Sequence, residues 1–247
     1  MPSTITLLTD FGTADGYVGE VKGVLSSGAP GATIVDITHD IPPHDVDAGR
    51  HTVARYWRRF PPGTVHLAVV DPAVGTERAA IAVASDGRFL VGPDNGLLTS
   101  ALLQAGARVI SLDVPPAASP TFHARDVFAP AAARLAGGAA IESLGAVGHD
   151  PVVLLIPEPE LDATGGVVGQ VIAIDHFGNA ITNLLAQRAT RVQVAGRTLK
   201  LVRTYGDLDP GEAGALIGST GYVEVVVGRG NAAKSLALAK GAAVRVS

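Results

Sequence analysis

The 247-residue sequence contains no cysteine. Disulfide bonds, thiolate metal sites and cysteine nucleophiles are therefore excluded, and a reducing compartment suits the composition. The segment after Met1 lacks the basic region, apolar run and small-residue cleavage site of a secretory signal, so we expect a cytoplasmic protein. No apolar stretch reaches the roughly 18 residues that a membrane-spanning helix needs, and we expect no membrane association.

Positive charge is also scarce, because 19 Lys and Arg residues stand against 23 Asp and Glu residues and give a net charge of −4. Nucleic-acid partners usually require a basic patch, so this balance argues against such a partner. Hydrophobic residues make up 47% of the chain and charged residues 17%, which is typical of a globular protein. The length allows one large domain or two domains of unequal size.

The first half of the chain alternates β-branched runs with helix-like segments, which predicts an α/β domain with a mostly parallel sheet. The predicted strands cover residues 4–9, 33–37, 64–70, 79–84, 89–91 and 108–112. The predicted helices cover residues 17–26, 46–59 and 97–104, and a fourth begins near residues 126–128 with Pro130 in its first turn.

The stretch between Ile156 and Val167 is rich in proline, glycine and charge, and it predicts a linker between domains at residues 1–157 and 166–247. Short strands follow at close spacing, which predicts a small β-barrel or β-sandwich. These strands cover residues 170–174, 191–194, 198–203 and 222–227, with a helix at 232–239 and a last strand from Ala243.

Two aspartates end apolar runs of the first half. Asp10 follows residues 5–9 and Asp71 follows residues 66–70. Ligands of open α/β sheets bind outside the carboxyl ends of the strands, so either carboxylate is a candidate for ligand binding. Capping of a turn is the alternative role for each of them.

Asp71 begins a turn that contains Pro72, ends at Gly75 and leads to Arg78, so the guanidinium can return to the same edge as the carboxylate. Arginine would keep the carboxylate ionised and oriented, although a structural salt bridge accounts for the pair equally well. His123 stands on a loop before a predicted helix, where an anion or a polarised water can bind.

Three further groups of polar residues are candidates for binding. His39, His44 and Asp47 are of the types that bind metals, although capping of the following helix accounts for this cluster better. Other candidate groups are Asp175, Phe177 and Asn179 with Thr182 and Asn183, and Tyr205 with the run from Ser219 to Tyr222. The group around Asp175 could hold the charged groups of an amino acid, and the group around Tyr205 could stack on a ring and form hydrogen bonds.

Six motifs occur along the chain in a fixed order. They are Leu8-Thr9-Asp10-Phe11-Gly12, Asp36-Ile37-Thr38-His39-Asp40-Ile41-Pro42-Pro43, Asp71-Pro72-Ala73-Val74-Gly75 with Arg78, Gly92-Pro93-Asp94-Asn95-Gly96, Phe122-His123-Ala124-Arg125-Asp126, and Phe177-Gly178-Asn179 with Thr182-Asn183. With these motifs the chain resembles, over essentially its whole length, the superfamily of S-adenosylmethionine hydrolases, fluorinases and chlorinases.

The resemblance implies a Rossmann-like N-terminal domain and a C-terminal β-barrel. It also implies a homotrimer whose active sites lie between the N-terminal domain of one subunit and the C-terminal domain of a neighbour. The implied activity is hydrolysis of S-adenosylmethionine at the ribose 5′ carbon to adenosine and methionine, with no metal and no cofactor besides the substrate itself.

The resemblance further implies that Asp71, Arg78 and His123 surround the attacking water and that Asp10 holds the ribose hydroxyls. The remaining implied substrate-binding residues are Phe122, Asp175, Phe177 and Asn179 (the last three at the methionine end), Tyr205 at the adenine, Ser219 at the carboxylate, Tyr222 and Ala232. Halogenating members have an uncharged residue such as tyrosine where this chain has Asp71, and a carboxylate there would repel a halide but can accept a proton from water. Alternatives are a halogenase, a metal-dependent hydrolase at the His39 cluster, and a binding protein without catalytic activity.

Overall fold

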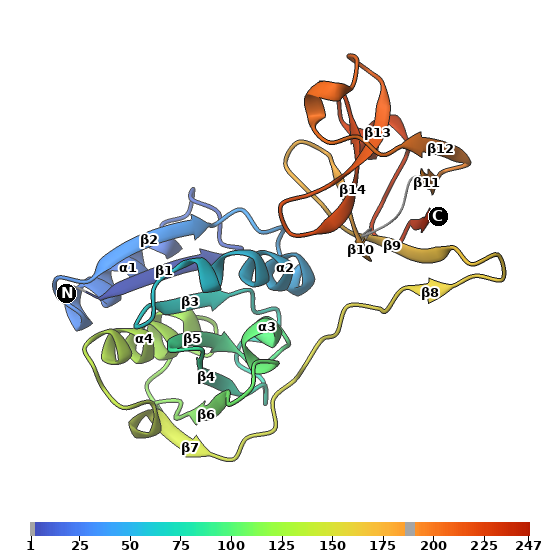
Figure 1. Cartoon of the computed structure of the whole chain (residues 1–247). Coiled ribbons are helices and arrows are strands. Elements are labelled where there is room, and N and C mark those ends of the chain that lie inside the picture. The colour runs from blue at the N-terminus through green and yellow to red at the C-terminus, as the bar shows by residue number, and fades with distance from the viewer. Residues whose placement is uncertain (1–2, 186–190) are drawn as a thin grey trace. The chain divides into compact units, whose positions relative to one another are not determined.

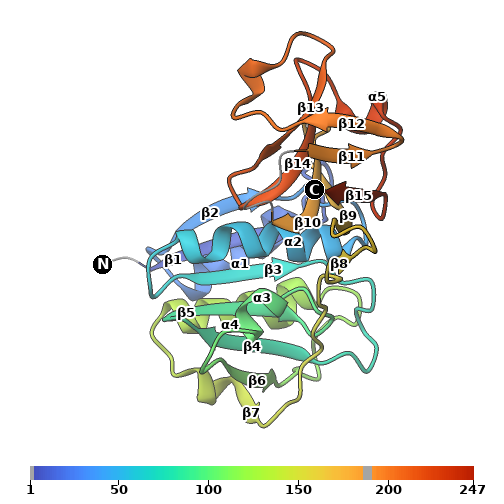
Figure 2. The ribbon, with the colours of Figure 1, turned by 45° about the vertical axis from the view of Figure 1, so that its right-hand side comes forward.

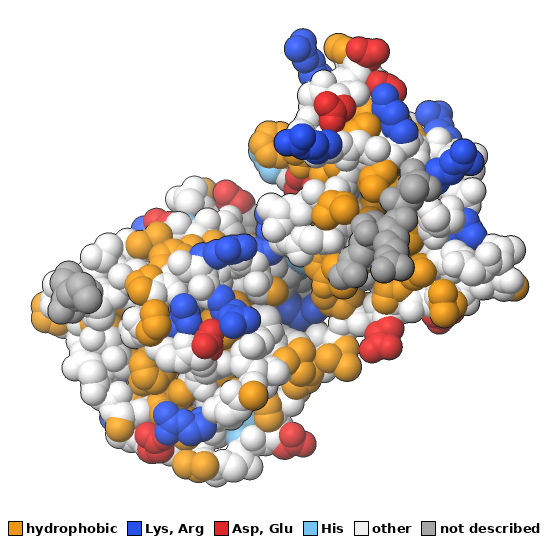
Figure 3. Space-filling view, in the orientation of Figure 1, with side chains coloured by type: hydrophobic (Ala, Val, Ile, Leu, Met, Phe, Trp, Pro, Cys, Tyr) orange, Lys and Arg blue, Asp and Glu red, His pale blue; other side chains and the backbone are white. Residues whose placement is uncertain are grey.

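A computed structural model describes residues 3–185 and 191–247 (Figure 1). The chain divides into two compact units, Met1–Leu154 and Leu155–Ser247. None of the helices in the described part of the chain combines the length and apolar character needed to cross a membrane. Acidic and basic side chains are scattered over the face of each unit that Figure 3 shows.

A seven-stranded sheet forms the centre of the N-terminal unit, in the order β2-β1-β3-β5-β4-β6-β7. The strands are β1 (Thr4–Thr9), β2 (Thr33–Thr38), β3 (Val65–Val69), β4 (Ala80–Ser85), β5 (Arg88–Pro93), β6 (Arg108–Leu112) and β7 (Gly145–Val147). Strands β2, β1, β3 and β5 run parallel, whereas β4 pairs antiparallel with both β5 and β6, and β6 pairs antiparallel with β7. The α/β class is confirmed, and the sheet is mixed, with three parallel and three antiparallel strand pairings.

The antiparallel part begins at the connection between β4 and β5. Only Asp86 and Gly87 separate the two strands, and both residues have positive φ angles, of 48° and 71°. Two left-handed residues between adjacent strands make a tight hairpin turn, which reverses the chain direction. A parallel connection would need a much longer crossover.

Helices cover both faces of this sheet (Figure 2). The helical segments are α1 (Tyr17–Gly28), α2 (Val46–Tyr56) with a 3₁₀ turn (Trp57–Arg59), α3 (Thr99–Leu102), a π-helical turn (Ala124–Phe128), α4 (Ala129–Ala136) and a 3₁₀ turn (Ile141–Leu144). Helices α1 and α4 pack together over one apolar core, and α2 and α3 pack over a second core. Strands β1 and β3 are almost completely buried because both of their faces are covered.

The connections that precede and follow β2 lead to opposite sides of β1. The chain passes from β1 through α1 to β2 on one side of β1, and returns through α2 to β3 on the other side. Strands β1 and β3 are parallel neighbours, with Thr9 opposite Val69. Asp10 and Asp71 therefore leave the sheet at the same edge, next to the position where the winding direction reverses.

The C-terminal unit is a nearly closed antiparallel barrel with the strand order β12-β11-β15-β9-β10-β14-β13 and with β8 paired to β9. Its elements are β8 (Glu160–Leu161), β9 (Val167–Ile174), β10 (Ala180–Leu185), β11 (Arg191–Val194), β12 (Arg197–Lys200), a 3₁₀ turn (Tyr205–Asp207), β13 (Ala213–Ile217), β14 (Tyr222–Val227), α5 (Ala232–Ser235) and β15 (Ala243–Val246). A bridge between Leu201 and Ala215 joins the two ends of the sheet, and the Val202 amide donates to the Ala215 carbonyl at 2.8 Å. This closure favours the barrel over the sandwich.

Part of the stretch expected to be a linker belongs to the C-terminal unit. Strand β8 lies within it and pairs with β9, and the Asn183 side chain donates to the Pro157 carbonyl at 2.6 Å. Four strands were not predicted, namely β7, β8, β10 and β13. Of the predicted helices, those at residues 97–104 and 232–239 are shorter, at Thr99–Leu102 and Ala232–Ser235.

Candidate active site

Asp71 and Arg78 form a buried ion pair at the carboxyl edge of the sheet. The guanidinium donates two hydrogen bonds to the carboxylate, from Nε to Oδ1 at 3.1 Å and from Nη2 to Oδ2 at 2.5 Å. The side chains are 5% and 7% exposed. The turn between them is held by the Thr76 hydroxyl, which donates to the Ala73 carbonyl at 2.8 Å, and by Gly75, whose φ of 78° suits glycine. The expected return of Arg78 to Asp71 is confirmed.

His123 is the third member of this group. Its Nδ1 lies 3.3 Å from Nη2 of Arg78, and the residue is 6% exposed. A guanidinium can only donate, so Nδ1 accepts the hydrogen bond and the N–H of the neutral ring is on Nε2. The ring of Phe128 packs edge-on to His123, and Arg78 lies over the same ring at 5.4 Å. Phe128 therefore supports the positions of both side chains, and sequence reasoning missed it.

The surroundings of Asp71 and His123 change their proton affinities. Burial raises the pKa of the Asp71 carboxyl above its ordinary value, although Arg78 and His123 act to lower it. Burial, together with the charge of Arg78, lowers the pKa of His123 despite the opposite influence of Asp71. The lowered pKa leaves His123 neutral at neutral pH, whereas the two hydrogen bonds from Arg78 favour the carboxylate form of Asp71 and burial increases its basicity. Such a group suits proton abstraction from water.

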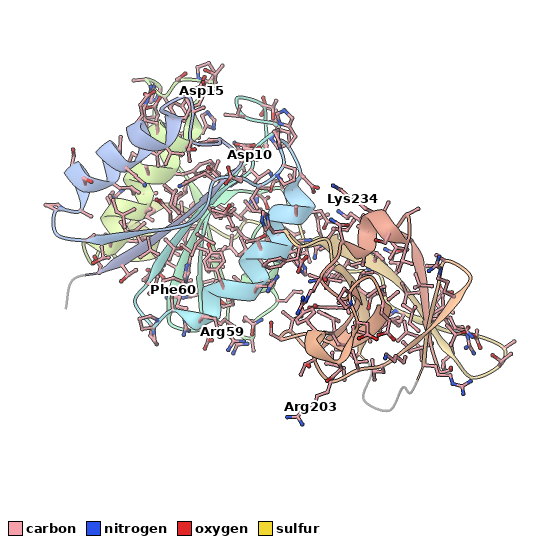
Figure 4. The ribbon with its side chains drawn as sticks, turned by 90° about the horizontal axis from the view of Figure 1, so that it is seen from above. Asp10, Asp15, Arg59, Phe60, Arg203 and Lys234 are labelled. Carbon is pink, nitrogen blue, oxygen red and sulfur yellow. The ribbon has the colours of Figure 1, made fainter. Side chains whose placement is uncertain are left out.

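Asp10 lies where β1 ends, on the opposite side of the unit from Phe60 (Figure 4). Its Oδ2 accepts a hydrogen bond of 2.9 Å from the backbone amide of His44. His44 has a φ of 69°, an uncommon conformation for a residue with a side chain. The carboxylate thus ties the loop after β2 to the end of β1.

The His39 cluster supports this loop. Nδ1 of His39 lies 2.9 Å from the Thr9 hydroxyl, and its Nε2 lies 3.1 Å from a carboxylate oxygen of Asp36. Asp45 accepts a hydrogen bond from the Ala48 amide and begins α2, so the helix-capping interpretation is confirmed. Within residues 3–185 and 191–247, no three His, Cys, Asp or Glu side chains gather as metal ligands would.

Phe122 lies beside His123 in an aromatic group. Its ring contacts Phe11 and Tyr17 edge-on, with centroids 6.0 Å and 5.3 Å away, and the Arg125 guanidinium lies 4.9 Å from its centre. Phe11 directly follows Asp10. The aromatic group therefore connects the loop that carries Asp10 with the segment that carries His123.

In the C-terminal unit, the predicted binding residues form two groups, at the two ends of β14. In the first, Asp175 accepts hydrogen bonds from the amides of Phe177 and Asn179 and from the Asn179 side chain, at 2.8 to 3.0 Å. These bonds fix a loop whose Phe177 ring is exposed. Ala232 is buried, and the amide of the next residue, Ala233, donates to the Gly178 carbonyl of this loop at 2.9 Å.

The second group lies at the start of β14. Ser219 is exposed in the hairpin between β13 and β14, and Tyr222 begins β14. The Tyr205 hydroxyl donates to the Glu224 carboxylate at 3.1 Å. Sequence reasoning missed Glu224, which is buried in the same strand; its acidic character within an apolar strand was the available signal.

Two family models match the chain, for the N-terminal domain of the SAM hydroxide adenosyltransferases at residues 5–145 and for their C-terminal domain at residues 169–245. The chain belongs to the SAM hydroxide adenosyltransferase family. A relative from Thermus thermophilus, named (R)-S-adenosyl-L-methionine hydrolase, is 43% identical over 98% of both chains. A fluorinase from Actinopolyspora mzabensis is 30% identical over 98% of this chain and 96% of its own.

The family's fold is also present in a solved structure. A crystal structure of an uncharacterized conserved protein from Thermotoga maritima superimposes with a TM-score of 0.89 at 34% identity, over 98% of this chain and 99% of that one. Both units of the chain therefore have counterparts in one protein.

Proposed function

We propose that this protein hydrolyses S-adenosylmethionine to adenosine and methionine by attack of water on the ribose 5′ carbon. The observation that carries the proposal is the buried Asp71 carboxylate, held by two donors of Arg78 and backed by His123. Relatives named as hydrolases of this compound, at 39% to 43% identity, support it.

The proposed reaction uses Asp71 as the general base. Asp71 accepts a proton from water as the oxygen forms a bond with the 5′ carbon, and the carbon–sulfur bond breaks with its electron pair remaining on methionine. Arg78 holds the carboxylate in one orientation, and neutral His123 can donate from Nε2 to the developing hydroxide. The sulfonium leaves as a neutral thioether, so the reaction needs no Lewis acid, and a chelator should leave the rate unchanged.

The fluorinase relative makes halide the nearest alternative nucleophile. The buried carboxylate argues against a halogenase, since the charge of Arg78 is already neutralised by Asp71 and a second anion would meet that carboxylate. Water, in contrast, can donate to Asp71. Turnover with and without added chloride or fluoride, with product analysis, distinguishes the two reactions.

The binding residues are assigned by the resemblance and supported by their local geometry. In this proposal Asp10 holds the ribose, Phe122 lines the site beside His123, and the N-terminal unit binds substrate in a Rossmann-like manner, at the carboxyl edge of its parallel strands. In the C-terminal unit the proposed substrate contacts are Asp175, Phe177 and Asn179 for methionine, Tyr205 for the adenine and Ser219 for the carboxylate, with Tyr222 and Ala232 as further substrate-binding residues.

Incubation with S-adenosylmethionine in oxygen-18 water tests the reaction. Label in the 5′ hydroxyl of adenosine is expected, because the nucleophile is solvent water. Unlabelled adenosine, or no adenosine, would overturn the proposal. Substrate binding without turnover would identify a binding protein.

Asp71→Asn tests the base. We expect the variant to bind S-adenosylmethionine with nearly unchanged affinity and to lose roughly 10²- to 10⁴-fold in kcat, because asparagine cannot accept the proton. Isothermal calorimetry measures the binding, and adenosine release measures kcat. A variant at the wild-type rate would remove Asp71 from the mechanism.

We also propose a cytoplasmic homotrimer with functional domains at residues 1–157 and 166–247, in which neighbouring copies share each active site. Asp71→Asn and Asn179→Ala should each be inactive. Mixed and refolded together, the two variants should regain part of the activity if sites are built from two copies. Sedimentation of the wild type measures the number of copies, and cell fractionation tests the location.

A further inference from the structure

The turn between β5 and α3 contacts the backbone on both sides of the Asp71–Arg78 pair. The motif Gly92-Pro93-Asp94-Asn95-Gly96, to which the proposed function gives no role, spans the end of β5 and the beginning of this turn. Nδ2 of Asn95 donates to the carbonyl of Val70 at 2.8 Å. Val70 is the residue before Asp71 and follows the last residue of β3. The side-chain amide thus fixes the peptide group from which Asp71 begins.

The neighbouring residue reaches the other member of the pair. The Asp94 amide donates to the carbonyl of Ala79 at 2.9 Å, and the Arg78 guanidinium donates to the same carbonyl through Nη1 at 2.8 Å. Two adjacent residues therefore contact both sides of the ion pair. Asn95 holds the backbone next to Asp71, and Asp94 holds the Ala79 carbonyl that orients Arg78.

The turn itself is held firmly. Oδ1 of Asn95 accepts from the Leu97 amide at 3.2 Å, and the carboxylate of Asp94 accepts from the Val152 amide at 2.8 Å and contacts Nε2 of His149 at 2.6 Å. At Gly92, a Cβ atom would lie 2.2 Å from the Ala68 carbonyl oxygen. Close approach of β5 to β3 at this point therefore requires glycine.

We propose that Asn95 is a positioning residue, which sets the geometry of Asp71 against Arg78 by holding the Val70 carbonyl. The inference rests on the proposed function for its effect on rate. It assigns Asn95 no contact with substrate or water. Loss of the Asn95 donor should let Asp71 move relative to both Arg78 and the substrate, and small misplacements of reacting groups cost roughly 10²-fold in rate.

Asn95→Ser is the sharpest variant. A serine hydroxyl can still accept from the Leu97 amide as a local turn does, but it is too short to reach Val70, and it adds no charge. Asn95→Ala is the second variant and removes both bonds. Gln104→Ala is the matched control, because the Gln104 amide also donates to a backbone carbonyl of the N-terminal unit, that of Ser100 at 2.9 Å.

The first readout is steady-state kinetics. We expect kcat to fall roughly 10- to 100-fold in both Asn95 variants while KM changes less than about threefold, with no change in Gln104→Ala. Wild-type kcat in both Asn95 variants, or an equal fall in Gln104→Ala, would overturn the inference. A rise in KM without a fall in kcat would also overturn it, because it would place Asn95 in substrate binding.

The second readout does not depend on activity. A carbon-13 NMR titration of protein labelled at the aspartate carboxyl carbon follows Asp71, with Asp71→Asn identifying its signal. The charged and titratable groups facing this carboxylate are Arg78 and His123. Arg78 lowers the pKa of Asp71, and this effect weakens when the carboxylate moves away from the guanidinium. The pKa of Asp71 should therefore rise further in Asn95→Ser. An unchanged pKa refutes the inference whether or not the wild type hydrolyses S-adenosylmethionine. A raised pKa in a protein without hydrolase activity would show that the proposed function alone has failed.

Discussion

Burial and Arg78 act on the Asp71 carboxylate in opposite directions. Burial raises the pKa of Asp71, and the guanidinium, with its two hydrogen bonds, limits that rise. A carboxylate with an ordinary pKa is a weak base, and one without a cation would be protonated in a buried site. The pair therefore combines ionisation at neutral pH with increased basicity, which a surface salt bridge would not.

The pH dependence of the reaction follows from these shifts. Asp71 must be ionised to accept a proton, so kcat/KM should fall as the pH drops through a pKa above the ordinary 3.8 of aspartate. His123 is neutral above its lowered pKa and should add no further change between about pH 7 and 9. Adenosine release at constant ionic strength measures the profile. An acid limb at or below the ordinary value would contradict the expected shift.

Individual residues differ in how far the sequence predicts them. The contact between Asp71 and Arg78 follows from a seven-residue turn with fixed geometry. His123 is 45 residues from Arg78, and only the family resemblance, not local spacing, indicated that they meet. Phe128 and Glu224 were missed because an apolar ring in a helix and an acid in a strand are common in many structural settings, and their partners are distant in sequence.

At the scale of elements, the turn after β3 packs against the segment before His123. Gly75 in this turn has a φ of 78°, and a Cβ atom there would lie 2.2 Å from the Pro120 carbonyl oxygen. The two segments thus approach as closely as glycine allows. Their contact fixes the distance between the Asp71 turn and the segment that carries His123.

Gly75→Ala should therefore impair both stability and catalysis. Alanine in the left-handed conformation costs about 1 to 2 kcal/mol, and displacement of the Pro120 carbonyl adds about 1 to 3 kcal/mol. Gly106→Ala is the control, because Gly106 has the same φ of 78° with open space around it. Urea unfolding measures the stabilities, and we expect Gly75→Ala alone to lower kcat by about tenfold. Equal effects of the two substitutions would show that the Pro120 contact is unimportant.

Elements with strong periodic or β-branched sequences were predicted well. Strands β1, β6, β11 and β14 have the expected bounds. Strand β10 was missed because Thr182 and Asn183 suggested a binding loop, although both side chains are buried and donate to backbone carbonyls of the C-terminal unit. Strand β13 (Ala213–Ile217) begins Ala-Gly-Ala, which has low strand propensity, so its pairing with β14 decides its conformation.

At the scale of the whole molecule, acid should destabilise the protein in two separate pH ranges. Asp126 and Asp162 have pKa values lowered first of all by hydrogen bonds from Arg125 and Arg245, so their stabilising effect is present at neutral pH and is lost only in strong acid. Protonation of His66 should destabilise the protein in a higher pH range. It is fully buried among the rings of Tyr56, Trp57 and Phe60, and its Nδ1 lies 2.8 Å from the Thr6 hydroxyl.

Burial, helped by the charge of Arg88, lowers the pKa of His66 from 6.5 to about 4. The unfolded chain therefore binds a proton near pH 6.5, whereas the folded protein resists it until about pH 4. The stability that neutral His66 provides is complete above pH 6.5 and is lost as the pH falls toward 4. At about pH 4.5 the loss should amount to about 2 to 3 kcal/mol.

His66→Gln removes this titration while keeping a polar side chain. Between pH 7 and about 4.5, the free energy of unfolding should fall by about 2 to 3 kcal/mol less in the variant than in the wild type. Trp57 is the only tryptophan and lies beside His66, so its fluorescence in urea reports the unfolding of the N-terminal unit. His176→Gln, at an exposed position, should keep the wild-type dependence. If His66→Gln lost stability on acidification as the wild type does, the acid sensitivity in this range would have to come from groups other than the buried histidine.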